Sequence, residues 1–451
     1  MVYGINNNIS VQQADVQLRL SALEIKLREA GRLPNLNFAS SAGYNFGRSI
    51  NRATNTFESR TIFFNNFQVQ SNVNLFNWFS QRHSIEAAKL STKAAEATKD
   101  KARNDIALNV ATAYLQALLA NEQIEVARVQ IAQTSSRLQN IIRQVTAGVL
   151  PELNAVELEV QLARDSAAYI GAGATYQQNL ILLKALLNLD MKVEFDIEKP
   201  DVSTIPVEAL ADLQPEAVYA EALKNLPQQR VNEFRYQSAI KEIQVAKASM
   251  YPTLSAFGNV GSQYSSLFPD QQRTQSIPTG KQDTLGSFEI TPGTTSYLVR
   301  PGFTFLIPNT TYGRQLFDVN LSQAVGLNLS IPIFNNRQLR TARDRAVLNA
   351  EGIKLQTAAD NLQVQQDIYA AYNDAVTAQQ QFFAAQKASE AADRSFGFSQ
   401  KRFDAGLLST LELLTNQNNL YRARLDALSA QYEFVFRMKL LEFYKGKGLK
   451  L

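Results

Sequence analysis

Four stretches of the chain alternate between apolar and polar residues, which is the period of a β-strand. Two of them begin after Pro34 and at Phe67, and two begin after Pro252 and at Val325. Each is about ten residues long, the length that a tilted membrane strand needs. Along the second stretch one face is made of amides, which are Gln68, Gln70, Asn72 and Asn74. The alternation predicts four strands, either of a membrane sheet or of a soluble sheet with one solvated face.

Aromatic residues gather at the strand ends, as in the interfacial girdles of membrane barrels. They are Phe76, Trp78, Phe79 and Phe334, with Tyr44 and Phe46 on the first strand. Four strands cannot close a barrel, and an open sheet edge is not tolerated in lipid. A membrane sheet built from these strands therefore requires several copies of the chain. The loop over about residues 265–320 is long, irregular and rich in Pro, Gly, Thr and Ser. Such a loop is typical of the outer face of a barrel, and a flexible insertion in a soluble protein looks similar.

The chain also repeats itself at a fixed interval. The sequence around Phe334 resembles that around Phe76, and the turn at Gly406 resembles the turn at Gly148. Both pairs are separated by 258 residues. Internal repeats determine the architecture of a chain. We therefore expect two halves, each made of two strands, a long helix, a tight turn and a returning helix.

The helical pattern in each half is too long for a compact domain. The segment between Phe79 and Gly148 contains neither Pro nor Gly, and only Gly352 and Gly397 interrupt the segment from Asn336 to Asp404. At 1.5 Å per residue each helix would be on the order of 100 Å long. Both carry an apolar stripe at heptad spacing: Ile106, Val110, Ala113, Ala117, Ala120 and Ile124 in the first, and Ile368, Ala371, Ala375, Ala378, Phe382 and Ala385 in the second. A second apolar line on the first helix runs through Leu108, Ala111, Leu115 and Leu118.

Two stripes on one helix predict packing neighbours on two sides, as in a wall of helices. Heptads taken alone favour an ordinary antiparallel coiled coil. The predicted segments are an N-terminal helix over 1–32, a first β-hairpin over 33–79, a long helical hairpin over 80–189, a linker and helix over 190–250, a second β-hairpin with a long external loop over 251–334, a second helical hairpin over 335–445, and a tail over 446–451.

Composition excludes several classes of function. The 45 basic and 41 acidic residues give a net charge of +4, which is too small to indicate nucleic-acid binding. The chain has no Cys, His83 is its one His, and it contains neither a phosphate-binding Gly-rich loop nor a metal-ligand cluster. We therefore expect neither an enzyme nor a cofactor or metal site.

The sequence shows neither of two common membrane-targeting signals. No run of about 18 apolar residues is present, so a transmembrane helix is not expected. The first ten residues, MVYGINNNIS, have neither the basic nor the apolar region of a secretory signal. If the protein is exported, we expect its signal to be absent from this chain.

These features resemble the TolC-type outer-membrane efflux proteins. The resemblance rests on Leu75-Phe76-Asn77 and Pro332-Ile333-Phe334-Asn335 at the strand-to-helix passages and on Lys401-Arg402-Phe403-Asp404-Ala405-Gly406 at the second turn. It covers the chain from about Ile9 to Tyr444, and Tyr44-Asn45-Phe46-Gly47-Arg48-Ser49 looks like the version common in Bacteroidetes. It implies a mixed α and β membrane protein in which three chains supply four strands each to a twelve-stranded outer-membrane barrel, continued by a helical periplasmic tunnel.

The resemblance also implies roles for particular residues. The two helical tips would contact a periplasmic adaptor protein through Ala147, Gly148, Val149, Leu150 and Pro151, and through Ala405, Gly406, Leu407, Leu408 and Ser409. Helix capping is the simpler role for the two glycines, and both roles can hold. Candidates for a constriction near the tips are Asn154, Glu412, Arg402 and Asp404. A threefold ring of Glu412 would favour cations, whereas an ordinary solvated helix-surface charge is the alternative.

The chain departs from the family pattern at the first turn, which lacks the aromatic residue that Phe403 supplies at the second. Leu408 and Thr415 stand where some members carry a basic and an acidic residue. The residues at the strand-to-helix junctions are Phe76, Asn77, Pro332, Phe334 and Asn335.

The function that the resemblance implies is passive export through the outer membrane of a Gram-negative bacterium, with a large periplasmic part. The partners would be two further copies of the chain, a periplasmic adaptor, indirectly an inner-membrane RND or ABC transporter, and membrane lipid. Drug or metal efflux and type I secretion are both possible. The alternative is a soluble or surface coiled-coil scaffold, such as an adhesin stalk, without channel activity.

Overall fold

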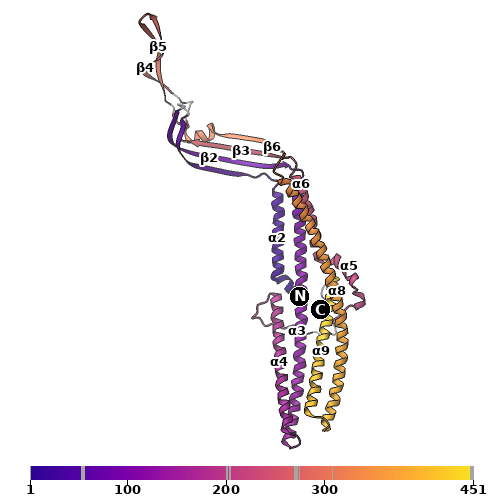
Figure 1. The fold of residues 1–451 in the computed structure, drawn as a ribbon. Coiled ribbons are helices and arrows are strands. Elements are labelled where there is room, and N and C mark those ends of the chain that lie inside the picture. The colour runs from indigo at the N-terminus through magenta and orange to yellow at the C-terminus, as the bar shows by residue number, and fades with distance from the viewer. Residues whose placement is uncertain are drawn as a thin grey trace. The chain divides into compact units, whose positions relative to one another are not determined.

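The computed structural model describes residues 2–51, 56–199, 202, 205–268, 273, 275–306 and 308–446. The chain divides into two compact units (Figure 1). The first contains residues 1–26, 84–243 and 344–451, and the second contains residues 27–83 and 244–343. The first unit is helical, whereas the second carries all of the strands. In the described part of the chain, no helix is both long and apolar enough to cross a membrane.

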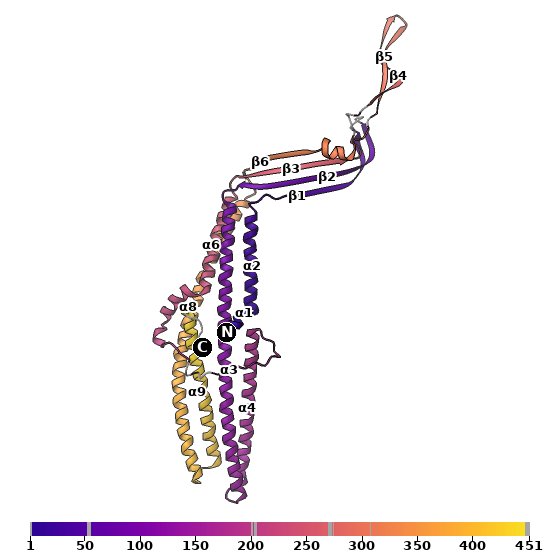
Figure 2. The ribbon, with the colours of Figure 1, turned by 180° about the vertical axis from the view of Figure 1, so that it is seen from behind.

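Two long helical hairpins make up most of the first unit. Their helices are α3 (Ser80–Thr146), α4 (Glu152–Leu187), α8 (Gln338–Asp404) and α9 (Thr410–Tyr444). Both α3 and α8 are 67 residues long, and both of their ends are offset by 258 residues, from 80 to 338 and from 146 to 404. In both views α4 returns along α3, α9 returns along α8, and the two turns lie at the same end of this unit (Figures 1 and 2). The long helices predicted from the repeat are confirmed.

Shorter helices complete the helical part of the chain. They are α1 (Val2–Asn7), α2 (Ile9–Ala30), η2 (Leu210–Asp212), α5 (Pro215–Asn225) and α6 (Pro227–Ala248). Proline is tolerated in the first turn of a helix, where its missing N–H needs no partner, but not in the interior. The helical segment preceding the second strand pair is therefore split into α5 and α6 at Pro227.

The heptad stripes form the core of the helical unit. On α3, Ile106, Val110, Ala113, Ala117 and Ala120 are all buried, and on α8 the same holds for Ile368, Ala371, Ala375 and Ala378. The second line on α3 is buried at Ala111, Leu115 and Leu118, and half-buried at Leu108. Small residues at these positions let the helix backbones approach closely. The expectation that α3 has neighbours on two sides is correct.

The segment between α4 and α5 is packed against the helices. Ile197, Val202, Ile205 and Leu213 are buried, and Tyr114 Oη donates a hydrogen bond of 2.8 Å to the Glu198 carbonyl. Tyr176 on α4 donates a hydrogen bond to the Asp196 carboxylate. The predicted linker therefore belongs to the core of the helical unit, although Pro200 lies outside the described residues.

The second unit contains an antiparallel sheet of four strands in the order β1-β2-β3-β6. The strands are β1 (Asn37–Asn51), β2 (Thr56–Phe76), β3 (Thr253–Ser265) and β6 (Ser322–Ser330). The first two are 15 and 21 residues long, longer than the stretches of about ten that the alternation predicted. Strand β6 ends at Ser330, although the alternation predicted a strand through Ile333. Pro332 has no N–H to donate to a ladder, which explains why this strand ends early.

The register joins the amides of neighbouring strands into one face. Gln70 lies opposite Asn37 on β1 and Asn259 on β3, whereas Val69 lies opposite Phe38 and Val260. Because facing residues in an antiparallel pair share a face, the amide row and the apolar row each continue across the strands. The sheet thus has one amide-rich face and one apolar face.

The predicted irregular loop between β3 and β6 contains structure. Strands β4 (Gln275–Thr291) and β5 (Thr294–Leu306) form a two-stranded hairpin, followed by α7 (Tyr312–Arg314) and the π-helical turn η4 (Gln315–Val319). The prediction of an irregular loop was wrong because Pro and Gly were taken as loop signals, although β5 is rich in the β-branched and aromatic residues that favour strands. Gly293, with φ of 91°, makes the turn. Fully buried Gln315 ties the loop back to the sheet by donating to the Ser265 carbonyl at 3.0 Å and accepting from the Ser265 N–H at 2.9 Å.

Candidate functional site at the helical tips

Both helical tips are closed by the same backbone motif. The Val149 N–H donates to the Gln144 carbonyl at 2.9 Å, and the Leu407 N–H donates to the Arg402 carbonyl at 2.9 Å. The residues before them, Gly148 and Gly406, have φ of 73° and 75°. Glycine adopts this left-handed conformation without a steric cost, and it ends helices in this way. The capping role of both glycines is confirmed.

Each tip also presents two exposed apolar side chains. Val149 and Leu407 are 69% and 70% exposed, and Leu153 and Leu411 are 64% and 63% exposed. Of the other tip residues, Ala147, Pro151, Ala405 and Ser409 are exposed, whereas Leu150 and Leu408 are half-buried. Sequence reasoning missed Leu153 and Leu411. The repeat could have found them, since they stand one helical turn beyond the first pair at the same offset of 258.

The helices that leave the two tips begin differently. Ser409 caps α9, because its Oγ accepts a hydrogen bond of 3.2 Å from the Glu412 N–H while the Glu412 carboxylate accepts one of 3.3 Å from the Ser409 N–H. At the matching place before α4, Pro151 offers no side-chain cap. Glu412 is exposed and its carboxylate takes part in this capping box, while the matching Asn154 is half-buried. Their role in a constriction stays a prediction.

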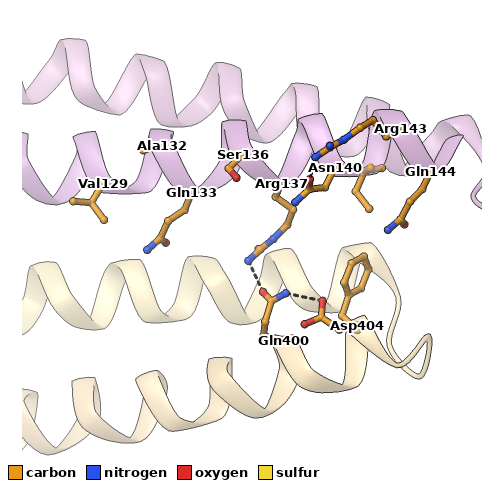
Figure 3. Close-up of a pocket in the computed structure, with 12 residues that line it drawn as sticks. Val129, Ala132, Gln133, Ser136, Arg137, Asn140, Arg143, Gln144, Gln400 and Asp404 are labelled. Atoms are coloured by element: carbon orange, nitrogen blue, oxygen red, sulfur yellow. Dashed lines mark hydrogen bonds between the residues drawn. The ribbon is translucent and has the colours of Figure 1, made fainter. Parts of the chain in front are cut away.

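Arg137 connects the two helical hairpins just above the tips. Its Nη1 donates to Gln417 Oε1 on α9 and its Nη2 donates to Gln400 Oε1 on α8, both at 2.5 Å. Gln400 Nε2 in turn donates to the Asp404 carboxylate at 2.9 Å, as Figure 3 shows. Burial lowers the pKa of Arg137, and the nearby charge of Asp404 opposes that shift. Of the constriction candidates, Asp404 thus belongs to a chain of polar contacts, and Arg402 is exposed.

The polar contacts continue into the interior between the four long helices. Gln417 Nε2 donates to Thr134 Oγ1 at 3.0 Å, and Thr134 Oγ1 donates to the Asp165 carboxylate at 2.6 Å. Gln161 donates to the same carboxylate at 2.7 Å and exchanges hydrogen bonds of 3.0 and 3.1 Å with Asn418. Thr134, Asp165, Gln161 and Gln417 are all buried. Buried polar groups are stable only when they are paired, so this polar layer fixes how the two hairpins meet.

An open groove runs beside this layer between α3 and α8. It has a volume of about 770 Å³ and is lined along α3 from Val129 to Gln144 and on α8 by Gln400, Phe403 and Asp404 (Figure 3). Its walls mix amides, Arg137, Arg143 and apolar side chains. Among the described residues no group of His, Asp or Glu is arranged to hold a metal ion. The groove offers hydrogen-bonding and apolar contacts to another protein surface.

The strand-to-helix junctions repeat in the second unit. Phe76 and Phe334 are exposed, and Asn77 and Asn335 are half-buried, as is Pro332. Two consecutive residues after each Asn adopt the left-handed conformation: Trp78 and Phe79 with φ of 52° and 62°, and Asn336 and Arg337 with φ of 52° and 63°. For residues other than Gly this conformation costs about 1–2 kcal/mol each. The same corner is therefore built twice, at an offset of 258 residues.

The first junction gathers a cluster of rings, whereas the described residues around Phe334 do not. Phe76 lies 5.5 Å from Trp78 and 5.9 Å from Phe79, measured between ring centroids, and Trp78 lies 4.9 Å from Tyr251. The contacts between these rings offset part of the strain of the two left-handed residues. At the second junction Phe334 is 80% exposed.

Comparison with known proteins matches the chain to a family model and to curated relatives. The model of the outer membrane efflux protein family matches residues 5–189 and 218–436. Nodulation protein T of Rhizobium leguminosarum bv. viciae is 22% identical over 270 residues, which are 58% of this chain and 52% of that protein. The pyoverdine export outer membrane protein OpmQ of Pseudomonas aeruginosa is 23% identical over 377 residues, which are 82% of this chain and 67% of that protein. The chain thus spans about half of the first relative and two thirds of the second.

Solved outer-membrane channels share the fold. CusC has a TM-score of 0.76 at 15% identity, with 99% of this chain and 91% of that chain covered. The Campylobacter jejuni channel CmeC has a TM-score of 0.74 at 15% identity, with 99% and 85% covered. VceC of Vibrio cholerae has a TM-score of 0.71 at 16% identity, with 99% and 95% covered. Since the family model matches most of its length, the chain belongs to the outer membrane efflux protein family.

Proposed function

We propose that the protein is a passive exit duct in the outer membrane of a Gram-negative bacterium. It would carry substrate out of an efflux or type I secretion system that an inner-membrane RND or ABC transporter drives. The family match together with the fold carries this proposal: an open sheet with an amide-rich face is followed by helices of about 100 Å. A duct needs no catalytic group, so the proposed role is not enzymatic.

The proposed duct is a homotrimer, because the sheet of a single chain has two open edges. Strands β1 and β6 are edges of the four-stranded sheet. Three copies joined from β6 to the next β1 would give twelve strands without an open edge, as a membrane requires. The helical unit also has exposed apolar stripes, with Val16, Leu20 and Leu23 on α2 and Leu348, Leu355 and Leu362 on α8. Neighbouring copies would cover these stripes.

The two faces of the sheet suit lipid and water. The apolar face carries Phe38, Val69 and Val260, and its far end has an aromatic cluster in which Tyr44 lies 5.2 Å from Phe63 and Phe63 lies 6.0 Å from Tyr264. We infer that this face contacts lipid and that the amide face lines a water-filled lumen. Amides hydrogen-bond to water and to solutes without strong charge preference, which fits a conduit for varied cargo.

The helical tips are the proposed docking surface for a periplasmic adaptor. Val149, Leu153, Leu407 and Leu411 are apolar and exposed, and an exposed apolar cluster rimmed by polar residues is typical of protein contact sites. The relative OpmQ is named for pyoverdine export. This favours efflux of small molecules here over secretion of proteins.

Substitution at the second tip tests this function. Leu407→Asp should abolish export in cells that lack the native protein, because a charge in the apolar contact removes roughly 2 kcal/mol or more of docking energy. Leu407→Met is the matched control, since it keeps an apolar side chain of similar size. Both variants should still form trimers in the outer membrane and conduct ions in planar bilayers. Normal export by Leu407→Asp would refute the tip assignment.

The same bilayer measurement separates the duct from a scaffold. A soluble coiled-coil stalk would purify without detergent as a monomer and give no conductance. The duct predicts outer-membrane fractionation and discrete pore openings. The first result would overturn the proposed function as a whole.

A further inference from the structure

Each edge strand of the four-stranded sheet contains one glycine that an aromatic ring of the next strand covers. Gly43 on β1 lies directly opposite Phe64 on β2, and Gly326 on β6 lies directly opposite Phe257 on β3. Gly326 is half-buried, whereas the other eight residues of β6 are all exposed. Gly43 is likewise half-buried, and all other residues of β1 whose exposure the structure describes are exposed. The cover is therefore confined to the two glycines.

The two positions need glycine for space and not for backbone conformation. A Cβ atom added at Gly326 would lie 2.8 Å from the Cζ atom of Phe257, and one added at Gly43 would lie 3.1 Å from the Cζ atom of Phe64. Carbon atoms in ordinary contact are about 3.5–4.0 Å apart. Neither glycine has a positive φ. Since glycine weakens the interior of a strand, the room that the ring takes is the reason for it here.

Both rings lie on the amide-rich face of the sheet. Phe64 stands four residues from Gln68 on β2, and Phe257 stands two residues from Asn259 on β3. Even spacing along a strand places side chains on one face. Each ring thus lies across the edge strand on the face that we propose lines the lumen.

The ring and the glycine together favour one register of each edge strand. The residues two positions from Gly326 are Ala324 and Asn328, and those two positions from Gly43 are Ser41 and Asn45. All four have a Cβ atom, so a slip by two residues would put a side chain where the ring lies. A slip by one residue would turn the amides of that strand to the apolar face.

We propose that Phe64 and Phe257 fix the register of the two edge strands, and through it the register in which neighbouring copies of the chain join. This inference rests on the trimer of the proposed function, in which β6 of one copy pairs with β1 of the next. The height of each edge strand in its own sheet determines which residues meet at that joint. A displaced edge strand would shift the joint by about 3.3 Å per residue. Both rings are thus positioning residues for assembly.

Alanine substitutions in the full-length chain test this role in outer-membrane vesicles. Gly326→Ala should lower the temperature at which trimers dissociate on native gels, because the added Cβ displaces the ring of Phe257. In a chain that already carries Phe257→Ala, the same substitution should not lower that temperature, since no ring is left to displace. Gly258→Ala is the matched control on β3, because among the described residues a Cβ at Gly258 would have no contact within 4 Å.

Cysteine pairs report the register itself, because the chain has no Cys of its own. Ser255 on β3 lies opposite Asn328 on β6, and Ser330 is two residues further along β6. Oxidation should join Ser255→Cys to Asn328→Cys but not to Ser330→Cys, since diagonal residues are about 7–8 Å apart and a disulfide does not span that distance. Phe257→Ala should raise the oxidised fraction of the diagonal pair severalfold, whereas Val260→Ala on the other face should not. Free thiols are counted by the mass of maleimide adducts.

Three results would overturn this role of the rings. Gly326→Ala could leave trimer stability unchanged, or lower it equally with and without the ring of Phe257. The diagonal pair could also stay reduced in Phe257→Ala. In each case trimers of the unsubstituted chain would leave the proposed duct standing. Monomers of the unsubstituted chain on the same gels would instead refute the trimer, and with it the proposed function.

Discussion

Arg137 is one residue that joins two helical hairpins. Its guanidinium reaches Gln417 on α9 and Gln400 on α8, and Gln417 continues to Thr134 and Asp165. Replacing one member of such a layer leaves the others buried without partners, which costs more than the bond itself contributes. No pattern in the sequence indicates this layer, since whether a Gln or Thr lies inside depends on how neighbouring helices are rotated.

The cost of removing Arg137 is a prediction at this scale. Arg137→Met should lower the stability of the purified protein by about 1–3 kcal/mol, because the Gln417 and Gln400 oxygens lose their donor. Thermal melts followed by circular dichroism at a fixed scan rate measure the change. The control is Arg128→Met, because Arg128 is 66% exposed and pairs with Glu125 within one helix. An equal loss in both variants would contradict the prediction.

Individual elements differ in how far the sequence predicts them. The absence of Pro, the scarcity of Gly and the heptad stripe predict α3 and α8 because these signals are local. The hairpin of β4 and β5 was not predicted from the sequence, because Pro, Gly and Thr occur in loops and hairpins alike. Strand β6 stops at Ser330 because Pro332 has no N–H group. The alternation of apolar and polar residues does not indicate such an end. At the tips the glycine turns were predictable, and the repeat marks Leu153 and Leu411 as a matching pair, but only the structure shows that both are exposed.

The segment that follows α4 offers a pH-dependent test. Burial raises the pKa of Tyr176, and its hydrogen bond to Asp196 raises it further, while the same bond lowers the pKa of Asp196. The bond needs a neutral Tyr and an ionised Asp. Its contribution is therefore complete above the ordinary Asp value of 3.8 and below the ordinary Tyr value of 10.0. It is lost as the pH falls through the lowered pKa of Asp196 or rises through the raised pKa of Tyr176.

Tyr176→Phe removes that bond. Between about pH 5 and 9 we expect a loss near 0.5–1 kcal/mol, at the low end for a hydrogen bond because Asp196 is largely exposed. Once the pH falls below the lowered pKa of Asp196, the two proteins should converge in melting temperature. A difference that stays constant across the whole acid range would show that packing of the ring, not the bond, is what Tyr176 contributes.

At the scale of the whole molecule, much of one chain's apolar surface is left uncovered. Leu348, Leu355 and Leu362 on α8 are each 66% exposed and stand seven residues apart, which is a heptad seam without its partner. The sequence predicts the repeat and the open sheet, and hence the need for copies. It does not show which helix faces become the seam, because buried and exposed stripes have the same spacing.

Replacing two seam residues tests the assembly. Leu355→Asp with Leu362→Asp should leave the monomer folded, since both side chains are exposed there, and should release trimers into monomers. Each buried Leu is worth about 1.5–3 kcal/mol, so the pair shifts the equilibrium strongly. Native mass spectrometry in detergent gives the fraction of trimer, with Leu355→Met and Leu362→Met as control. Unchanged trimer in the Asp variant would place the seam elsewhere.

The offset of 258 residues has a consequence for stoichiometry. A ring of three copies would present six turns of nearly equal backbone shape, in two alternating kinds, one after Gly148 with Pro151 and one after Gly406 with the Ser409 cap. A partner that reads only the backbone shape would have six sites. One that reads Ser409 and Glu412 against Pro151 and Asn154 would have three. In such a ring, the number of partner sites would therefore depend on whether the partner contacts the backbone turns or the side chains that differ between them.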